Sequence, residues 1–152
     1  MILYLLPNQI IMFSKACEYA IKSMIYIESN GVDNSKIKLN EIAEAIDSPV
    51  AFTAKILQQL KRNGLLISTI GAKGGFQIEK NKPITIKEIV YAIDGDGFFN
   101  KCVLGLKVCS SDNPCPAHRA YIKIKEAMIK DLLDLELDEF TKNIINKSIT
   151  LK

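Results

Sequence analysis

Hydrophobic residues recur at helical spacing through the first third of the chain. From Ser14, which is suited to cap a first turn, an apolar stripe predicts a helix, formed by Ala20, Ile21, Met24 and Ile25. A polar stretch at residues 31–35 ends this pattern. A shorter stripe follows, of Leu39, Ile42, Ala43 and Ile46, and predicts a second helix of about eight residues.

A third helix is predicted from Pro49 to Asn63. The residues at 47–49 (D-S-P) combine a chain break, an N-cap and a proline at the first helical position. One side of this helix is apolar, with Phe52, Thr53, Ile56, Leu57 and Leu60. The other side carries small, basic and amide residues and no carboxylate: Ala51, Ala54, Lys55, Gln58 and Arg62, with Gln59 and Lys61 at its edges.

A β-hairpin is predicted directly after this helix. Residues 65–70 (LLISTI) are apolar and β-branched, 71–75 (GAKGG) form a glycine-rich tip, and 76–78 (FQI) return. A short helix, a tight turn, an exposed second helix and a hairpin are typical of a winged helix-turn-helix. The expected fold class is therefore mostly α with a small β-hairpin wing, followed by a long C-terminal dimerisation helix.

The second half of the chain is predicted to be helical on either side of an irregular loop. Thr85 and Glu88 form a capping box for a helix over Ile86–Ile93. A long helix is expected from Pro116, and residues 137–149 are expected to form a last short helix. The apolar face of the long helix is broad, with a stripe of Tyr121, Ile124, Met128 (or Ala127), Leu132 and Leu135 that is widened by Ile122, Ile129 and Leu133. Such a width favours a homodimer, since DNA readers of this kind bind two half-sites.

These patterns divide the chain of 152 residues into four segments. We expect an N-terminal extension at 1–11, a winged helix-turn-helix domain at 12–83, a linking helix with a Cys/His loop at 84–118, and a dimerisation helix with a tail at 119–152. The extension is apolar, but it is far shorter than the roughly 20 residues that span a bilayer, so no membrane association is expected. An arm that packs on a partner chain is the alternative for it.

Charge is distributed unevenly, although the net charge of the chain is only +3. Between residues 49 and 82 there are six basic side chains and one acidic side chain, a net of +5. Between residues 126 and 139 there are six acidic side chains and one lysine, a net of −5. The positive segment coincides with the predicted helix-turn-helix, which indicates contact with the phosphates of a double-stranded DNA operator.

Three of the four cysteines and the only histidine fall within the 17 residues 102–118. Thiolates select zinc, copper(I) or iron–sulfur clusters, and imidazole suits zinc and iron, so this crowding predicts a metal or cluster site. A loop with small buried thiols and a surface histidine is the alternative. An enzyme is not expected, because one histidine beside cysteines leaves no independent general base. Four cysteines without a secretory signal favour the reducing cytoplasm.

Several short motifs, in this order, resemble the Rrf-two family of bacterial transcription regulators, which includes the IscR, NsrR and CymR proteins. The motifs are S-K-A-C-E-Y-A-I at 14–21, E-I-A at 41–43, L-K-R-N-G-L-L at 60–66, G-A-K-G-G-F at 71–76 and then the cysteine loop. The resemblance extends from Met12 to about Asn143. It implies a homodimeric transcription factor, not an enzyme, in which a winged helix-turn-helix is joined to a long dimerisation helix.

Members of this family with three cysteines typically hold a 2Fe–2S or 4Fe–4S cluster and sense iron–sulfur status, nitric oxide or redox state. The resemblance places the metal ligands at Cys102, Cys109, Cys115 and His118, with Glu18 of the partner subunit as the competing fourth ligand. A 2Fe–2S cluster is favoured, and zinc is the alternative. Six residues separate Cys102 from Cys109, slightly more than is usual in the family. Cys17 has no place in this site and is expected to be a small buried hydrophobic residue.

For DNA, the family's base-contacting positions match Ala51, Ala54 and Lys55, and Gln58 is a further polar reader. The complete set of expected DNA-binding residues is Ser48, Ala51, Ala54, Lys55, Gln58, Lys61, Arg62, Lys73 and Gly74. The expected function is a DNA-binding regulator, with repression favoured, whose operator binding is controlled by an iron–sulfur cluster. A zinc-bound or cluster-free regulator of the same fold is the first alternative, and an electron-transfer or cluster-carrier protein is the second.

Overall fold

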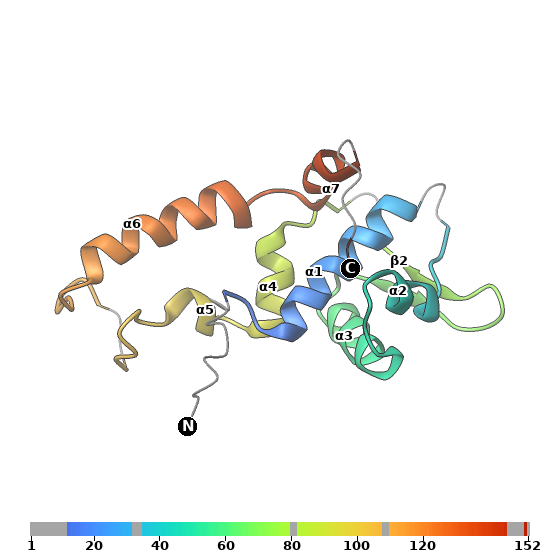
Figure 1. Ribbon diagram of the computed structural model, residues 1–152, viewed down its shortest axis with the longest axis horizontal. Helices are drawn as coiled ribbons and strands as arrows, with labels where there is room; N and C mark the ends of the chain where they lie inside the picture. The colour runs from blue at the N-terminus through green and yellow to red at the C-terminus, as the bar shows by residue number, and fades with distance from the viewer. Residues whose placement is uncertain (1–11, 32–34, 80–81, 108–109, 146–150, 152) are drawn as a thin grey trace, which may run out of the picture.

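A computed structural model describes residues 12–31, 35–79, 82–107, 110–145 and 151 of the chain (Figure 1). The N-terminal extension expected at 1–11 lies outside the described residues. The elements follow in the order α1 (Lys15–Asn30), α2 (Leu39–Ala45), α3 (Val50–Arg62), β1 (Ile67–Thr69), β2 (Gly75–Gln77), α4 (Ile86–Asp94), α5 (Gly97–Asn100), α6 (His118–Met128), η2 (Ile129–Leu133) and α7 (Leu137–Ile145). The predicted winged helix-turn-helix is confirmed.

Helix α1 begins where the sequence predicts. The Ser14 hydroxyl accepts a hydrogen bond from the backbone N–H of Cys17 at 3.1 Å, which satisfies one of the free donors of the first turn. The same hydroxyl donates to Asp94 at the end of α4, and the Ser14 backbone N–H donates to the second oxygen of that carboxylate at 3.0 Å. The start of α1 is therefore tied to the end of α4.

The turn between α2 and α3 differs from the prediction in its capping. Asp47 has a φ of 51°, which breaks the helix as expected. Helix α3 then begins at Val50 with Pro49 as its N-cap residue, and the Ser48 hydroxyl makes no cap hydrogen bond. The Ser48 Oγ is buried and has no partner in the part of the chain that the structure describes. The prediction of Ser48 as the N-cap is therefore wrong, because the extended proline takes that position.

The wing is an antiparallel hairpin that is shorter than predicted. Its register pairs Ile67 with Gln77 and Thr69 with Gly75. Ile37 adds a third segment, because its N–H and C=O exchange hydrogen bonds with Phe76 at 2.9 and 2.8 Å. Gly75 has a φ of 154°, and a Cβ at this position would lie 2.7 Å from the carbonyl oxygen of Ile37. The close approach of the two backbones thus requires glycine here.

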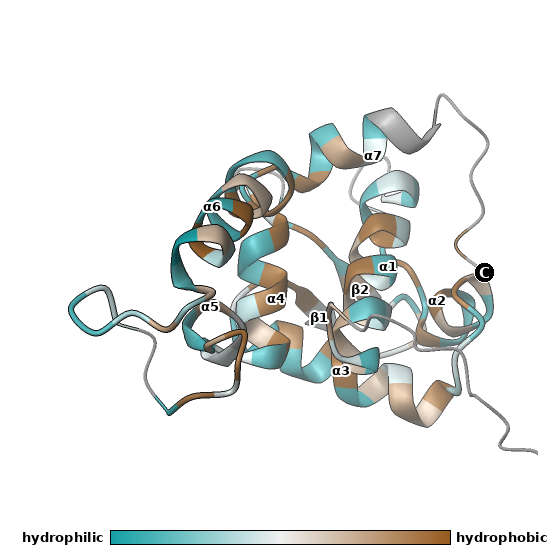
Figure 2. Cartoon of the chain, turned by 60° about the vertical axis from the view of Figure 1, so that its left-hand side comes forward, coloured by the Kyte–Doolittle hydropathy of each residue, from teal (hydrophilic) through white to brown (hydrophobic). Residues whose placement is uncertain are grey.

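The core lies among α1, α3 and α4, whose apolar faces turn inward (Figure 2). Its largest fully buried side chains include Met24, Ile27, Ile42, Leu57, Leu60 and Ile89. Phe52 reaches the edge of this core and packs edge-to-face on Tyr19, with ring centroids 5.7 Å apart. The apolar side predicted for the third helix is therefore the side that α3 buries.

The long C-terminal helix is interrupted. Helix α6 begins at His118, two residues later than predicted, and passes into the π-helical turn η2, where the Asp134 N–H donates to the Ile129 carbonyl at 2.8 Å. Leu133 in η2 is fully buried, whereas Ile124 in α6 is 68% exposed. Figure 1 shows α6 extending away from the body that α1, α3 and α4 form. The short helix α5 was not predicted.

One further sequence prediction is confirmed by the described elements. The capping box of α4 is present, with the Thr85 N–H donating to the Glu88 carboxylate at 2.8 Å and the Glu88 N–H donating to the Thr85 hydroxyl at 3.3 Å. None of the helices described is long and apolar enough to cross a lipid bilayer.

Candidate nucleic-acid interface and metal centre

The side of α3 that faces away from the core presents the expected DNA-binding residues to solvent. Lys55 and Gln58 are exposed, as is Ala51, while Ala54 is half-buried between them. Because Thr53, Ile56, Leu57 and Leu60 are buried on the opposite side, the orientation of the helix is determined by its core contacts. A small, smooth surface flanked by one ammonium and one amide is therefore available to base edges.

The end of α3 and the wing add basic side chains on the same domain. Lys61 and Arg62 are exposed in the last turn of α3, and Lys73 is exposed at the tip of the wing. Gly74 closes that tip through a hydrogen bond from its N–H to the Gly71 carbonyl at 2.8 Å. A Cβ at Gly74 would collide with the carbonyl oxygen of Thr69, so this glycine is required by the turn itself.

Gln59, which the sequence places at the edge of the DNA-facing side, is exposed as well, but its amide is bonded to another helix. Its amide Nε2 donates to the carbonyl of Ala92 at 2.9 Å and to that of Ile93 at 3.4 Å. These carbonyls are at the C-terminal end of α4, where helical carbonyls lack internal partners. Gln59 therefore joins the predicted recognition helix to α4, a contact that helical periodicity alone could not assign.

The opposite pole of the molecule is acidic. The negative segment covers η2, the link after it and the start of α7, where Asp131, Asp134, Glu136 and Glu139 are exposed. In both overall views α7 lies on the far side of the body from α3 (Figures 1 and 2). The charge separation seen in the sequence is thus a separation in space, with the positive side on the helix-turn-helix.

Two of the predicted metal ligands lie together. The Sγ atoms of Cys102 and Cys115 are 3.9 Å apart, although 12 residues separate them in the chain. Two thiolates that bind one tetrahedral metal at about 2.3 Å are about 3.8 Å apart, so this pair has the separation that a shared zinc or iron requires. Cys102 is buried and Cys115 is half-buried, and neither is in a disulfide. The donor set therefore fits a thiolate-bound metal.

Among the described candidates, neither His118 nor Glu18 completes a group of three ligands with this pair. His118 is 8% exposed in the first turn of α6, and its Nε2 lies 3.4 Å from the Ser111 hydroxyl. Glu18 forms an ion pair with Lys15 at 2.9 Å on the surface of α1. Cys109 lies outside the described residues. Among the residues that are described, no three Cys, His, Asp or Glu side chains form a group that could hold a metal ion.

Contacts on either side fix the ends of the loop that carries these residues. Cys102 follows α5 directly, and the Cys115 carbonyl accepts a hydrogen bond from the His118 N–H at 3.0 Å at the start of α6. The Lys125 ammonium of α6 donates to the carbonyl of Phe99 in α5. Figure 1 shows the loop at one end of the long axis, with the wing at the other end. The two sulfur atoms thus close the base of a loop that lies far from the DNA-facing side.

The fourth cysteine is isolated, as the sequence predicts. Cys17 is fully buried in α1 and lies near Asp94. Burial, reinforced by the negative charge of Asp94 and a hydrogen bond to it, raises the pKa of the Cys17 thiol from its ordinary value of 9.0 to about 12. This thiol is a core residue and not a ligand.

We expect Cys17 to resist alkylation in the folded protein. At pH 8 the raised pKa reduces its thiolate fraction about a thousandfold relative to an unfolded chain, and burial blocks access as well. Timed treatment with iodoacetamide, followed by peptide mass spectrometry, measures the rate at each cysteine. Modification of native Cys17 at a rate similar to that of Cys115 would contradict the prediction, and the urea-unfolded protein is the control.

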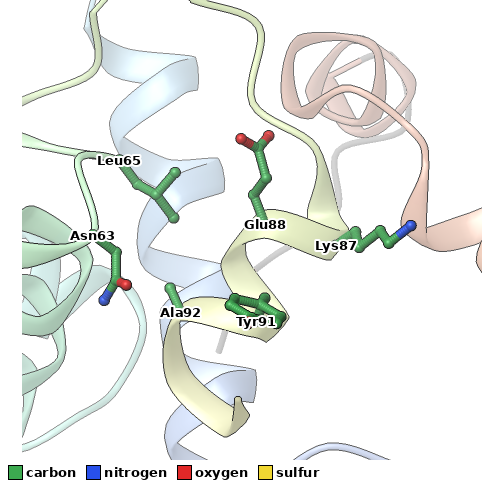
Figure 3. Close-up of a pocket in the computed structure, with 6 residues that line it drawn as sticks. All are labelled: Asn63, Leu65, Lys87, Glu88, Tyr91 and Ala92. Atoms are coloured by element: carbon green, nitrogen blue, oxygen red, sulfur yellow. The ribbon is translucent and has the colours of Figure 1, made fainter. Parts of the chain in front are cut away.

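A separate pocket of about 320 Å³ lies between the end of α3 and α4, and is lined by Asn63, Leu65, Lys87, Glu88, Tyr91 and Ala92 (Figure 3). Both of its charged side chains have structural partners. Glu88 accepts the capping hydrogen bonds of Thr85, and the Lys87 ammonium lies 3.6 Å from the Asp134 carboxylate. The pocket is therefore not the candidate site.

Comparison with known proteins shows which family the chain is related to. Residues 13–143 match the model of the Rrf2 family, described as iron-dependent transcriptional regulators. The chain belongs to the Rrf2 family. Its members are transcriptional regulators rather than enzymes, and they bind DNA, so the helix-turn-helix belongs to a regulator.

Relatives and solved structures agree with this membership. An HTH-type transcriptional regulator of Aquifex aeolicus is 32% identical over 136 residues, which covers 82% of this chain and 92% of the relative. The regulator IscR of Klebsiella pneumoniae strain 342 is 24% identical over 126 residues, covering 82% of this chain and 76% of the relative.

Among solved structures, CymR, the global cysteine regulator of B. subtilis, superposes with a TM-score of 0.68 at 22% identity, covering 86% of this chain and 96% of CymR. IscR of T. potens superposes with a TM-score of 0.65 at 18% identity, covering 88% and 89%. These likenesses establish that the described chain has the Rrf2 winged-helix fold.

Proposed function

We propose that this Rrf2 regulator is a homodimer whose binding to an operator is controlled by an iron–sulfur cluster held in the loop between α5 and α6. In this proposal the cluster is of the 2Fe–2S type, and the protein acts in the cytoplasm, preferentially as a repressor. The signal is iron–sulfur status, nitric oxide or redox state. The separation of the Cys102 and Cys115 sulfur atoms carries the proposal, because two thiolates at 3.9 Å have metal-ligand spacing.

In this proposal the cluster ligands come from different parts of the loop. Cys102 and Cys115 bind from the two ends of the loop, and Cys109 binds from the middle. His118 lies at the start of α6, three residues after Cys115, and is the favoured fourth ligand. Glu18 of the partner subunit competes for that position. An imidazole ligand is protonatable and more weakly bound than a thiolate, which favours a labile cluster.

An iron–sulfur cluster supplies an inorganic core that oxidants and nitric oxide can disassemble. The protein supplies the connection from the loop to the DNA-facing helix. Cys102 follows α5, which follows α4, and the end of α4 accepts the hydrogen bonds of Gln59 from α3. Binding of the three cysteines would hold the loop ends together, and their release would loosen the link that runs through α5 to the end of α4. The coupling required is modest, about 1–3 kcal/mol, or 5–150-fold in affinity.

The dimer is proposed to form through α6. Ile124 is 68% exposed there, and Leu104 and Leu106 in the adjoining loop are 55% and 53% exposed. A projecting helix with exposed apolar side chains is suited to a partner surface. Two copies would place two recognition helices on successive half-sites of an operator, and symmetric half-sites match the symmetry of a homodimer.

A zinc-bound regulator is the second candidate, because the same sulfur separation suits tetrahedral zinc. The two candidates differ in what they do to DNA binding. Zinc has no redox chemistry, so a zinc-bound protein would bind its operator in the same way before and after exposure to oxidant or nitric oxide.

The experiment that tests the proposal is purification without oxygen, followed by an absorption spectrum, iron and zinc counts, and operator binding. We expect a coloured protein with bound iron, and an operator affinity that changes 5–150-fold when the cluster is removed. Cys102→Ser and Cys115→Ser are expected to lower iron content more than tenfold, since each removes a ligand. Cys17→Ala is the matched control and should retain its iron.

Two outcomes would contradict the proposal. A colourless protein with one zinc per chain, and operator binding indifferent to oxidant, would support the zinc-bound regulator instead. An iron-containing protein whose operator affinity is the same with and without the cluster would leave the DNA-binding function in place and remove the sensor function.

A further inference from the structure

We propose that Cys102 and Cys115 form an intrachain disulfide in the metal-free protein, so that the loop between α5 and α6 is a thiol-redox modification site as well as a ligand site. The formation of this bond does not depend on the proposed cluster. Its regulatory meaning rests on the proposed function, since a disulfide removes two of the three thiolates that would bind metal.

The distance between the sulfur atoms is the first observation. A disulfide bond is about 2.05 Å long, so the two Sγ atoms, 3.9 Å apart, need to approach by about 1.9 Å. Rotation about the Cα–Cβ bonds moves a sulfur atom by this amount without a change in the backbone path. A hydrogen bond from the Lys125 ammonium to the carbonyl of Phe99 also joins α6 to α5, the two helices on either side of the loop.

The two thiols differ in exposure, which indicates the order in which they react with an oxidant. Cys115 is half-buried and accessible, whereas Cys102 is 7% exposed. An external oxidant therefore reaches Cys115 first, and Cys102 acts as the resolving thiol behind it. Cys17, at 0% exposure in α1, is excluded from the reaction.

The oxidant is a low-molecular-weight disulfide such as oxidised glutathione. The Cys115 thiolate attacks one sulfur of the oxidant, forms a mixed disulfide and releases one thiolate. The Cys102 thiolate then attacks the Cys115 sulfur and displaces the second thiolate. Two protein thiols thus lose two electrons and two protons, and the oxidant is reduced to two small thiols. An excess of small thiol reverses both steps.

The consequence is a third state of the loop besides metal-bound and open. The disulfide holds the two ends of the loop together, as a bound metal would. The two thiolates are then no longer available to bind a metal together with Cys109 and His118. Metal cannot load until a thiol reductant has cleaved the bond. A bound metal, conversely, protects both cysteines from oxidation.

The test uses the full-length protein, stripped of metal with a chelator, reduced, and then titrated with oxidised glutathione. Intact mass and non-reducing peptide mapping follow the product. We expect a chain two hydrogen atoms lighter, with a Cys102–Cys115 cross-link in most molecules. Cys109→Ser, the matched control, should form the same bond. Cys102→Ser should stop with one glutathione attached to Cys115, and Cys115→Ser should form no cross-link. Zinc chloride added before the titration should suppress the reaction at least tenfold.

Three results would overturn the inference: a cross-link that includes Cys109, a bond that joins two chains, or a reaction that ends at mixed disulfides in the unsubstituted protein. Its failure is distinguishable from failure of the proposed function. A protein that forms the Cys102–Cys115 bond but never binds iron retains the inference and loses the cluster proposal, and a protein that binds iron but never forms the bond does the reverse.

Discussion

Replacing Lys61 and Arg62 together by glutamate is expected to weaken operator binding about 100-fold for each DNA-reading head near physiological salt, because each lost phosphate contact costs on the order of tenfold. Both side chains are exposed in the last turn of α3, next to the predicted base-reading surface. The reversal removes two positive charges from each DNA-reading head and adds two that repel phosphate. The slope of log affinity against log salt should therefore become shallower by about two for each head.

Fluorescence anisotropy with a labelled operator fragment, measured at several salt concentrations, gives both quantities. Lys142→Glu is the matched control. It reverses one charge per chain, half the change of the double variant, on α7, which lies on the far side of the body from α3, and it loses only an exposed ion pair with Asp138 (Figure 1). Its operator affinity should stay within about twofold of the unsubstituted protein. An equal loss in both variants would mean that net charge, and not the position of α3, determines binding.

Leu60→Ala is expected to lower the free energy of unfolding by about 3 kcal/mol, which corresponds to roughly 6–12 °C in Tm for a chain of this length. Leu60 is fully buried on the inner side of α3, and its carbonyl accepts a hydrogen bond from the Leu65 N–H at 3.0 Å. The truncation leaves a cavity at the point where the recognition helix packs against the rest of the domain. The orientation of that helix would lose part of its support as well.

Far-UV circular dichroism during heating measures the effect, at one fixed protein concentration because dimerisation makes Tm depend on concentration. Ile70→Ala is the matched control, since it removes a similar amount of hydrocarbon from a side chain that is 96% exposed beside the wing. Its Tm should change by less than about 2 °C. A Leu60→Ala protein as stable as Ile70→Ala would show that α3 is not held by the core contacts described above.

The helix-turn-helix was predictable because its signals are local. Ser14 as a cap, the capping box of Thr85 and Glu88, and the glycines of the wing each act on neighbouring residues, and each is found where the sequence places it. The burial of the apolar side of α3 follows from its periodicity in the same way. The exception is Ser48, because a proline in an extended conformation replaced a side-chain cap.

The features that the sequence did not predict depend on partners distant in the chain. The helical periodicity places Gln59 at the edge of the DNA-facing side, but its amide donates to the carbonyl of Ala92, 33 residues further along the chain. The approach of Cys102 to Cys115 was anticipated only as ligand crowding, since a loop's path cannot be derived from periodicity. The positions of Cys109, His118 and Glu18 relative to a metal stay predictions.

The apolar stripe of the long helix differs in phase from the prediction. The sequence places Leu132 on the stripe and Leu133 at its margin, whereas the structure buries Leu133 completely and leaves Leu132 half-buried. The cause is η2, whose hydrogen bonds span five residues instead of four. The local sequence of Ile129–Leu133 does not predict a π-helical turn.

The π turn η2 rotates the side chains of α6 about the helix axis relative to the residues that follow the turn. A π turn contains one residue more than an α-helical turn. Side chains before the turn are therefore rotated by about 100° around the axis, compared with their positions in an uninterrupted α-helix. The surface of α6 that carries Ile124 is therefore not in angular register with Leu133, which is buried in the core. Insertion or deletion of one residue at η2 would consequently change which face of α6 meets another molecule. The packing of the DNA-binding domain would stay the same.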